Sequence, residues 1–259
     1  MIPGLRRLSI ALALVVAACA PSAAPAPAGP EKATVTDTTA SELVAVMNAW
    51  QGALSRRDLS GYQATIDLTR AAFRRCQSET FDIAARQGFT PSEVRVAKVE
   101  PYLDTYVRAY VGDDTNGYSR MYFRREAGKW IRSEPLDTEL GGDQTKTVDG
   151  LKLSYYGIDN DVIDTYAASG NDARVFLLKQ AEGHTSTGQA FGLRIFPTRG
   201  AAGPSVGCAV GGNLALTATD PLVRIYSNSL SFRSDLSTVT ESTSSIIRHE
   251  GLHLSLIHI

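Results

Sequence analysis

The sequence predicts an α+β protein, in which helices and a twisted antiparallel sheet are followed by a partial second α+β domain. Its 259 residues are 43% hydrophobic and carry a formal net charge of -1, an ordinary globular balance with room for one or two domains. The spacing of apolar residues changes from helical to alternating after Gly88, and a second block of mixed elements ends in one more helix. No block of Lys or Arg is dense enough to indicate nucleic acid, so we expect no nucleic-acid partner.

The N-terminus has the layout of a secretory signal. Arg6 and Arg7 precede an apolar stretch, residues 8–18, that is too short to span a bilayer. The stretch ends in Val16-Ala17-Ala18-Cys19, which resembles the lipobox of bacterial lipoproteins. The resemblance implies that residues 1–19 are a lipoprotein signal peptide, cleaved before Cys19, and that Cys19 carries the lipid. The alternative is a plain signal peptide with a small-residue cleavage site.

Residues 20–38 are rich in Pro and Ala, and this composition predicts an extended tether. Together with a lipid on Cys19, the tether implies an extracytoplasmic protein anchored to a bacterial cell membrane. Whether this is an inner or an outer membrane stays open.

Two further cysteines, Cys76 and Cys208, leave two alternatives. Outside the cytoplasm they could form a disulfide, or each could be buried separately as a free thiol. Sequence alone does not place their Cα atoms within reach of each other, so both alternatives stand.

Residues 39–140 predict a first domain of helices followed by an antiparallel meander. Thr39 and Glu42 have the spacing of a capping box and start an amphipathic helix, and a second helical region covers residues 59–86. Alternating residues then predict four strands, at 94–96, 106–111, 118–124 and 130–132, with a hairpin turn at Asn116-Gly117.

This order of elements resembles the nuclear-transport-factor-2-like (SnoaL-like) superfamily. The resemblance implies a cone-like fold that binds a small molecule, catalyses with polar residues in the cone, or serves as an accessory domain beside an enzyme. The stretch contains no His, so we interpret it as an accessory or binding domain. Tyr106, Tyr110 and Tyr122 form an aromatic row at strand spacing, which favours packing over ligand binding.

Residues 148–259 predict a second domain of mixed elements. Strands are expected at 151–155, 190–197 and 222–226, and a helix runs from Asp159 or Asn160 to Gln180, with residues 169–172 as candidates to interrupt it. The glycine-rich passage 200–212 is interpreted as turns, because it lacks the order of a phosphate-binding loop. The final helix is expected to begin near Thr238, whose spacing to Glu241 forms a second capping box.

The final helix contains the most specific motif of the chain, His249-Glu250-Gly251-Leu252-His253. Residues four apart lie one turn above each other in a helix, so both imidazoles could reach one Zn²⁺ while Glu250 stands beside it. Zn²⁺ in such a site acidifies a water, and Glu250 would accept its proton. The motif therefore predicts metal ligands at His249 and His253 and a catalytic base at Glu250.

With the strand and helix order before it, this motif resembles the peptidase MA-like gluzincins, a class of zinc metallopeptidases. The resemblance implies a zincin-type domain that cleaves a peptide or protein substrate. It also implies that an upstream edge strand holds the substrate backbone, and the candidate residues for that strand are Gly212, Asn213, Leu214 and Ala215. Gluzincins take a third zinc ligand, a glutamate, from a following helix, and it has no counterpart before Ile259. As written, Leu256 and Ile259 exclude the metzincin pattern.

Residues 254–259 read Leu-Ser-Leu-Ile-His-Ile, which is also the translation of a transposase adapter end used in library preparation. We therefore expect that the reading frame was cut inside the peptidase domain; the alternative is a genuine apolar helix extension. With two histidines alone, the 259-residue chain is expected to bind zinc weakly and to lack peptidase activity. The alternative function is a non-catalytic lipoprotein whose first domain binds a small molecule or a protein partner.

Overall fold

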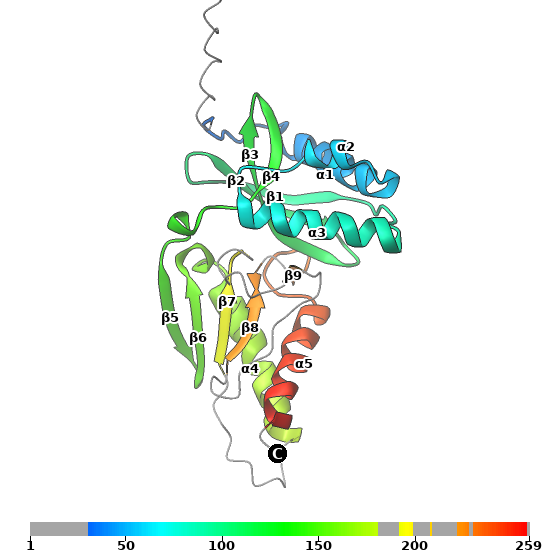
Figure 1. Cartoon of the computed structure of the whole chain (residues 1–259). Helices are drawn as coiled ribbons and strands as arrows, with labels where there is room; N and C mark the ends of the chain where they lie inside the picture. The colour runs from blue at the N-terminus through cyan, green and yellow to red at the C-terminus, as the bar shows by residue number, and fades with distance from the viewer. Residues whose placement is uncertain (1–30, 181–191, 199–207, 209–221, 228–229, 258–259) are drawn as a thin grey trace, which may run out of the picture.

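The computed structural model describes residues 31–180, 192–198, 208, 222–227 and 230–257. These residues form two sheets with helices packed on each, and Figure 1 shows the two units one above the other. The first sheet is antiparallel, and the second contains both antiparallel and parallel pairs. The predicted α+β class is therefore confirmed.

The first unit begins with helices α1 (Thr39–Arg56), α2 (Leu59–Gln63) and α3 (Ala71–Gln87). Its sheet has the order β1-β2-β3-β4, with the strands β1 (Arg95–Tyr102), β2 (Tyr106–Asp113), β3 (Gly117–Glu126) and β4 (Lys129–Ser133). Leu43 and Met47 of α1 pack on Val107 and Phe123 of the sheet, and all four are almost fully buried. Periodicity predicted these elements because each has one apolar face.

The predicted capping box of α1 is wrong. The N-cap is Thr38, which makes no side-chain cap hydrogen bond, and the Thr39 hydroxyl instead accepts from the backbone N–H of Thr36 at 2.8 Å. Glu42 accepts a hydrogen bond from the indole N–H of Trp130 at 2.7 Å. Glu42 also accepts from the hydroxyl of Thr38 at 3.0 Å, so it makes both a local contact and a tertiary contact to β4.

The second unit is a mixed sheet with the order β5-β6-β7-β8. Its strands are β5 (Asp143–Val148), β6 (Leu151–Tyr156), β7 (Gly192–Phe196) and β8 (Leu222–Tyr226). The first two are antiparallel, whereas β6, β7 and β8 run parallel. The short helix η2 (Gly157–Asp159) and the long helix α4 (Ile163–Gln180) connect β6 to β7. The chain then continues to β9 (Ser231–Phe232) and α5 (Glu241–Ile257).

Helix α4 continues through residues 169–172, so the expected interruption is wrong. A Cβ added at Gly170 would lie 2.6 Å from Leu151 Cδ2 and 2.7 Å from Leu193 Cδ1. The glycine therefore serves close packing of α4 on the sheet rather than a break, since a larger residue would collide with β6 and β7.

Strands β5 and β9 have no counterpart among the predicted elements. β5 is polar and mostly exposed, and it pairs only with β6 among the described strands. β9 has two residues and pairs with β3 of the first sheet, at Tyr118↔Phe232 and Ser119↔Ser231. Gly117, at the start of β3, has φ +84°, and a Cβ there would lie 2.6 Å from the carbonyl oxygen of Phe232. The glycine of the predicted Asn116-Gly117 turn therefore also leaves the space in which β9 packs against β3.

The two units share one core. Tyr110 and Tyr118 of the first sheet belong to the same buried cluster as Leu153, Ile195 and Ile225 of the second. The β2–β3 face of the first unit meets η2, β9 and the end of β7. We call this junction the seam. It is defined by Tyr110, Tyr118, Arg120, Asp159, Pro197 and Phe232.

A disulfide joins Cys76 of α3 to Cys208, with a Cα–Cα distance of 4.9 Å. Both residues are buried. Of the two alternatives left open by the sequence, the structure has the disulfide, and it links the first unit to the segment that precedes β8.

The described chain starts inside the segment expected to be a tether. Ala33 is buried, and its N–H donates to the carbonyl of Asp104 at 2.7 Å. Cys19 and the signal sequence lie outside the described residues. Within the described part of the chain, every helix is too short or too polar to cross a membrane.

Candidate functional site

Helix α5 carries the His-Glu-x-x-His motif, and contacts to β9 and to the shared core hold its first half in place. Its first turn is capped by Thr240, whose hydroxyl accepts from the N–H of Thr243 at 3.3 Å. The helix therefore starts near the expected position, but the predicted capping box of Thr238 and Glu241 is wrong. Thr243 in turn accepts from the N–H of Ser231 in β9 at 2.9 Å. Ile247 is fully buried in the shared core. These contacts fix the direction of α5 relative to the seam.

Helices α4 and α5 lie side by side (Figure 1), and polar and aromatic contacts connect them. The hydroxyls of Ser169 and Ser244 are 3.2 Å apart. The guanidinium of Arg248 lies 5.7 Å from the ring centroid of Phe176 and also pairs with Glu241 at 2.8 Å. The helix that carries the motif is thus anchored by its neighbours on the N-terminal side of the motif.

The structure places His249, Glu250 and His253 on this one continuous helix. His249 is exposed, whereas Glu250 is only 9% exposed and follows Ile247 by one turn. The side chain of His253 lies outside the described part, although its backbone is helical. The candidate edge strand, Gly212 to Ala215, also lies outside the described residues.

The donor chemistry of this motif fits zinc, because imidazole nitrogens one helical turn apart and a neighbouring carboxylate are common at zinc sites. The motif alone, however, supplies fewer donors than a zinc site needs. Among the described residues, no group of three His, Cys, Asp or Glu side chains is placed to hold a metal ion.

A second polar arrangement, which was not predicted, lies at the seam. The guanidinium of Arg120 on β3 is 1% exposed and donates to Asp159 of η2, which is fully buried. Beside it, Arg108 pairs with Asp161 at 2.7 Å and with Glu100 of β1. Tyr and Arg alternate on one face of the strands between residues 106 and 124. This pattern indicates a polar layer, but it does not identify the acidic residues that pair with the arginines.

Several polar atoms of this layer are not satisfied. Arg120 Nε, Asp159 Oδ2 and the Tyr166 hydroxyl are buried and have no hydrogen-bond partner among the described residues. Burial raises the pKa of Asp159, and this outweighs the opposite effects of Arg120 and Ser227. Buried polar atoms without a hydrogen-bond partner are uncommon in folded proteins.

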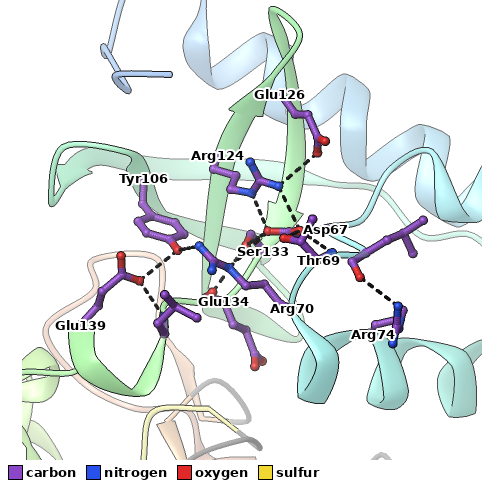
Figure 2. A network of polar contacts seen from close by, with 12 residues as sticks. Asp67, Thr69, Arg70, Arg74, Tyr106, Arg124, Glu126, Ser133, Glu134 and Glu139 are labelled. Atoms are coloured by element: carbon purple, nitrogen blue, oxygen red, sulfur yellow. Dashed lines mark hydrogen bonds and ion pairs between the residues drawn. The ribbon is translucent and has the colours of Figure 1, made fainter. Parts of the chain in front are cut away.

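A third polar arrangement centres on Asp67, in the turn between α2 and α3 (Figure 2). Its carboxylate accepts hydrogen bonds from Arg124, from the hydroxyl of Ser133 at 2.7 Å and from the hydroxyl of Thr69 at 2.6 Å. Burial alone would raise the pKa of Asp67, but these hydrogen bonds together hold it well below its usual range. The arrangement ties the start of α3 to β3 and β4.

Arg70 extends this arrangement toward the surface. It lies 3.5 Å from Asp67 and donates to the hydroxyl of Tyr106 at 2.5 Å, and that hydroxyl donates to Glu139 at 3.0 Å. Tyr106, Tyr110 and Tyr122 are all buried. Their packing role stays a prediction, since Tyr122 also lines a cavity.

Two adjoining cavities lie between the start of α3 and the seam. The outer one has a volume of about 210 Å³ and is lined by Arg70, the first turn of α3, residues 134–137 and Thr198. The inner one, of about 70 Å³, is lined by Arg120, Arg132 and Pro197 among others. Both are bordered by Phe73 and Glu134, so they are neighbours in one cleft.

Comparisons of the chain with protein-family models, with curated proteins and with solved structures find no match.

Proposed function

We propose that this chain belongs to a zinc-dependent metallopeptidase whose metal site is built on α5. The observation that carries the proposal is that His249, Glu250 and His253 lie on one continuous helix, with Glu250 almost buried and His249 exposed. A helix anchored to α4 and to β9 can hold such side chains in a fixed relation to a metal ion. An accidental motif in a loop would lack this support.

In this proposal each motif residue has one role. His249 and His253 would hold Zn²⁺ together with a third ligand from outside the described residues. When bound there, Zn²⁺ would supply Lewis acidity toward a water and the scissile carbonyl. Glu250 accepts the proton of the attacking water and donates it to the leaving amine.

The arrangement of the second unit supports a zincin-type interpretation of its fold. A mixed sheet carries a crossover helix, α4, and is followed by the motif helix α5, which packs on α4 and β8. The first unit, with three helices on an antiparallel sheet, is proposed as a nuclear-transport-factor-2-like accessory domain that helps to position a peptide or protein substrate.

The disulfide supports an extracytoplasmic location. Disulfides persist in oxidising compartments and are rare where thiol reductants are abundant. The buried bond between Cys76 and Cys208 therefore agrees with export, with Cys19 as the proposed lipid anchor.

Zinc titration of the metal-free 259-residue chain, in competition with a chromogenic chelator, tests the ligands. We expect weak binding that His249→Ala and His253→Ala each abolish. His184→Ala is the matched control, because it removes a histidine outside the motif. Unchanged zinc binding in both motif variants would rule out α5 as the metal site.

The role of Glu250 is tested by Glu250→Gln. The substitution keeps the size of the side chain but removes the basic carboxylate, so zinc affinity should persist. In a protein that carries the complete ligand set, peptide cleavage should fall by at least about 100-fold, as expected for the loss of a general base. Retained cleavage would show that another group accepts the proton.

A further inference from the structure

The turn between β2 and β3 contains a chemically reactive dipeptide. Asn116 is the only asparagine in the chain that precedes a glycine. Its side chain is exposed, and it lies in the turn 114–116 that closes the hairpin. Gly117 has no side chain of its own to crowd its backbone nitrogen. This nitrogen can therefore react with the neighbouring carboxamide in an intramolecular ring closure.

The ring closure converts asparagine to aspartate or isoaspartate without an enzyme. The backbone nitrogen of Gly117 loses its proton to a solvent base and bonds to Cγ of Asn116. The bond from Cγ to Nδ2 breaks, and ammonia leaves after Nδ2 takes a proton from solvent. Water then opens the cyclic imide at either carbonyl. Opening at the main-chain carbonyl leaves Gly117 bonded to Cγ, which adds one carbon to the backbone.

The carboxylate of Asp113 holds the Asn116 carboxamide. Nδ2 of Asn116 donates to the two oxygens of Asp113, at 3.1 and 2.9 Å, and the backbone N–H of Asn116 donates to Oδ1 at 2.7 Å. The hydrogen bond from the Asn116 side chain is the largest cause that lowers the pKa of Asp113, so this carboxylate is charged at neutral pH. A negative charge at this place opposes both the deprotonated nitrogen and the anionic transition state of ring closure.

The next residue, Asp114, gives a comparison within the same turn. Its carboxylate pairs with Arg95 of β1 at 2.7 Å and accepts from the hydroxyl of Tyr118 of β3 at 2.8 Å. Among the contacts of the described residues, none joins the Asp114 side chain to Asn116. The two acids of the turn therefore carry the same charge, but only Asp113 binds the reacting group.

The glycine of the dipeptide lies where β9 and the start of α5 meet the hairpin. Gly117 is buried, and a Cβ added there would lie 2.6 Å from the carbonyl oxygen of Phe232 and 2.5 Å from Cγ2 of Thr240. An extra backbone carbon before Gly117 does not fit so tight a space without a shift of its neighbours. Because Thr240 caps α5, such a shift reaches the helix that carries the His-Glu-x-x-His motif.

We propose that Asn116 is a site of spontaneous deamidation and that Asp113 slows the reaction in the folded protein. The isoaspartyl product loosens the pairing of β9 with β3 and the first turn of α5. The proposal depends on the turn and its neighbours alone, so it stands or falls independently of zinc binding by α5.

Peptide mapping by mass spectrometry follows the reaction in the 259-residue chain, incubated in mildly alkaline buffer either folded or in concentrated urea. Asp113→Ser removes the charge but keeps a side-chain oxygen as an acceptor for the turn. Asp114→Ser is the matched control, because it removes the same charge from the neighbouring residue. Asn116→Gln should abolish the signal, which assigns it to this residue. Thermal unfolding establishes that each variant is folded.

We expect Asn116 in the folded chain to react at least about tenfold more slowly than in urea, because hydrogen bonds to a charged group hold the carboxamide. Asp113→Ser should accelerate the reaction of the folded chain at least about fivefold. Asp114→Ser should change it less than about twofold. The proposal is overturned if Asn116 does not react in the folded Asp113→Ser variant, or if the two serine variants react at the same rate.

The structural consequence is measured on the isoaspartyl form after its separation by anion-exchange chromatography. Hydrogen exchange should be faster at β9 and in the first turn of α5 than in the unmodified chain, while α1 keeps its protection. Unchanged exchange at β9 would contradict the proposed loosening.

Discussion

Two buried arginine–aspartate pairs on the same face of β3 differ in how well they are satisfied. Arg124 pairs with Asp67 within the first unit, and Arg120 pairs with Asp159 across the seam. The carboxylate of Asp67 also accepts from two hydroxyls, whereas Oδ2 of Asp159 has no partner among the described residues. The same pair of residue types is therefore placed in two different environments.

The difference shows that the contribution of an Arg–Asp pair to stability depends on the groups that surround the pair. Hydrogen bonds hold the pKa of Asp67 below its usual range, so its charged form is stabilised by folding. Burial raises the pKa of Asp159, so its charged form is disfavoured in the folded protein. A buried charge pair stabilises a fold when the remaining hydrogen-bonding groups are also met, and otherwise desolvation dominates.

The largest expected effect is that of removing Asp67. Asp67→Ala leaves the buried guanidinium of Arg124 and the hydroxyl of Ser133 without their acceptor. We expect the free energy of unfolding to fall by about 3–5 kcal/mol, measured by urea denaturation. A loss below about 1 kcal/mol would mean that the pair is not essential to the first unit.

The seam should instead depend on its covalent link. Replacing Cys76 and Cys208 together by Ser should lower the free energy of unfolding by about 2–4 kcal/mol. Hydrogen exchange should show faster exchange at β9 and η2, while α1 and β2 keep their protection. Equally faster hydrogen exchange in both regions would show that the two units unfold together. The seam would then not differ from the interior of the first unit.

Replacing each pair by apolar residues sharpens the comparison. Arg120→Met with Asp159→Leu removes unsatisfied atoms, which offsets the loss of the Ser227 hydrogen bond, so the free energy of unfolding should change by less than about 1 kcal/mol. Arg124→Met with Asp67→Leu strands the hydroxyls of Thr69 and Ser133, and we expect a loss of about 2 kcal/mol or more. Urea denaturation of both double variants measures the difference; the reverse order would contradict our view of the seam.

A further contrast is in the pH dependence of stability. Because the folded pKa of Asp67 is depressed, its contribution is complete above its ordinary value of 3.8 and is lost as the pH falls through the folded pKa. Because the folded pKa of Asp159 is raised, its contribution is complete below 3.8 and is lost as the pH rises through the folded pKa.

Asp159→Asn should therefore lose more stability than the unmodified chain on acidification from about pH 7 to about pH 4. Asp67→Asn should differ in its pH slope only below about pH 4. Thermal unfolding from about pH 7 to about pH 2 is the measurement. Parallel profiles for the unmodified chain and Asp159→Asn would mean that Asp159 has an ordinary pKa.

Local sequence patterns predicted the elements that carry a regular apolar face, such as α1, β2, β3 and α4. They missed β5, which is polar, and β9, which is only two residues long, because neither has enough residues on a buried face to show a period. The predicted break near Gly170 failed because α4 packs so closely on β6 and β7 that a glycine is required there. The predicted cap at Thr39 failed because its hydroxyl accepts from the N–H of Thr36 instead of capping the helix.

The candidate sites divide in the same way. The spacing of His249, Glu250 and His253 is a local pattern that predicts a shared helix. All three residues do lie on α5. The cleft could not be foreseen, because its walls come from α3, β3 and the end of β7, far apart in the chain. The alternation of Arg and Tyr in β3 shows a polar face but does not identify Asp159 or Asp67 as the partners.

By itself, the sequence determined the α+β class, the order of most elements and the helix that holds the proposed zinc ligands, because each depends on the periodic spacing of neighbouring residues. Tertiary structure alone decided that Cys76 bonds to Cys208 and that the two units share a core. It also decided which buried charge is satisfied, since that depends on which faces meet. Long-range pairing of this kind leaves no periodic trace in the chain.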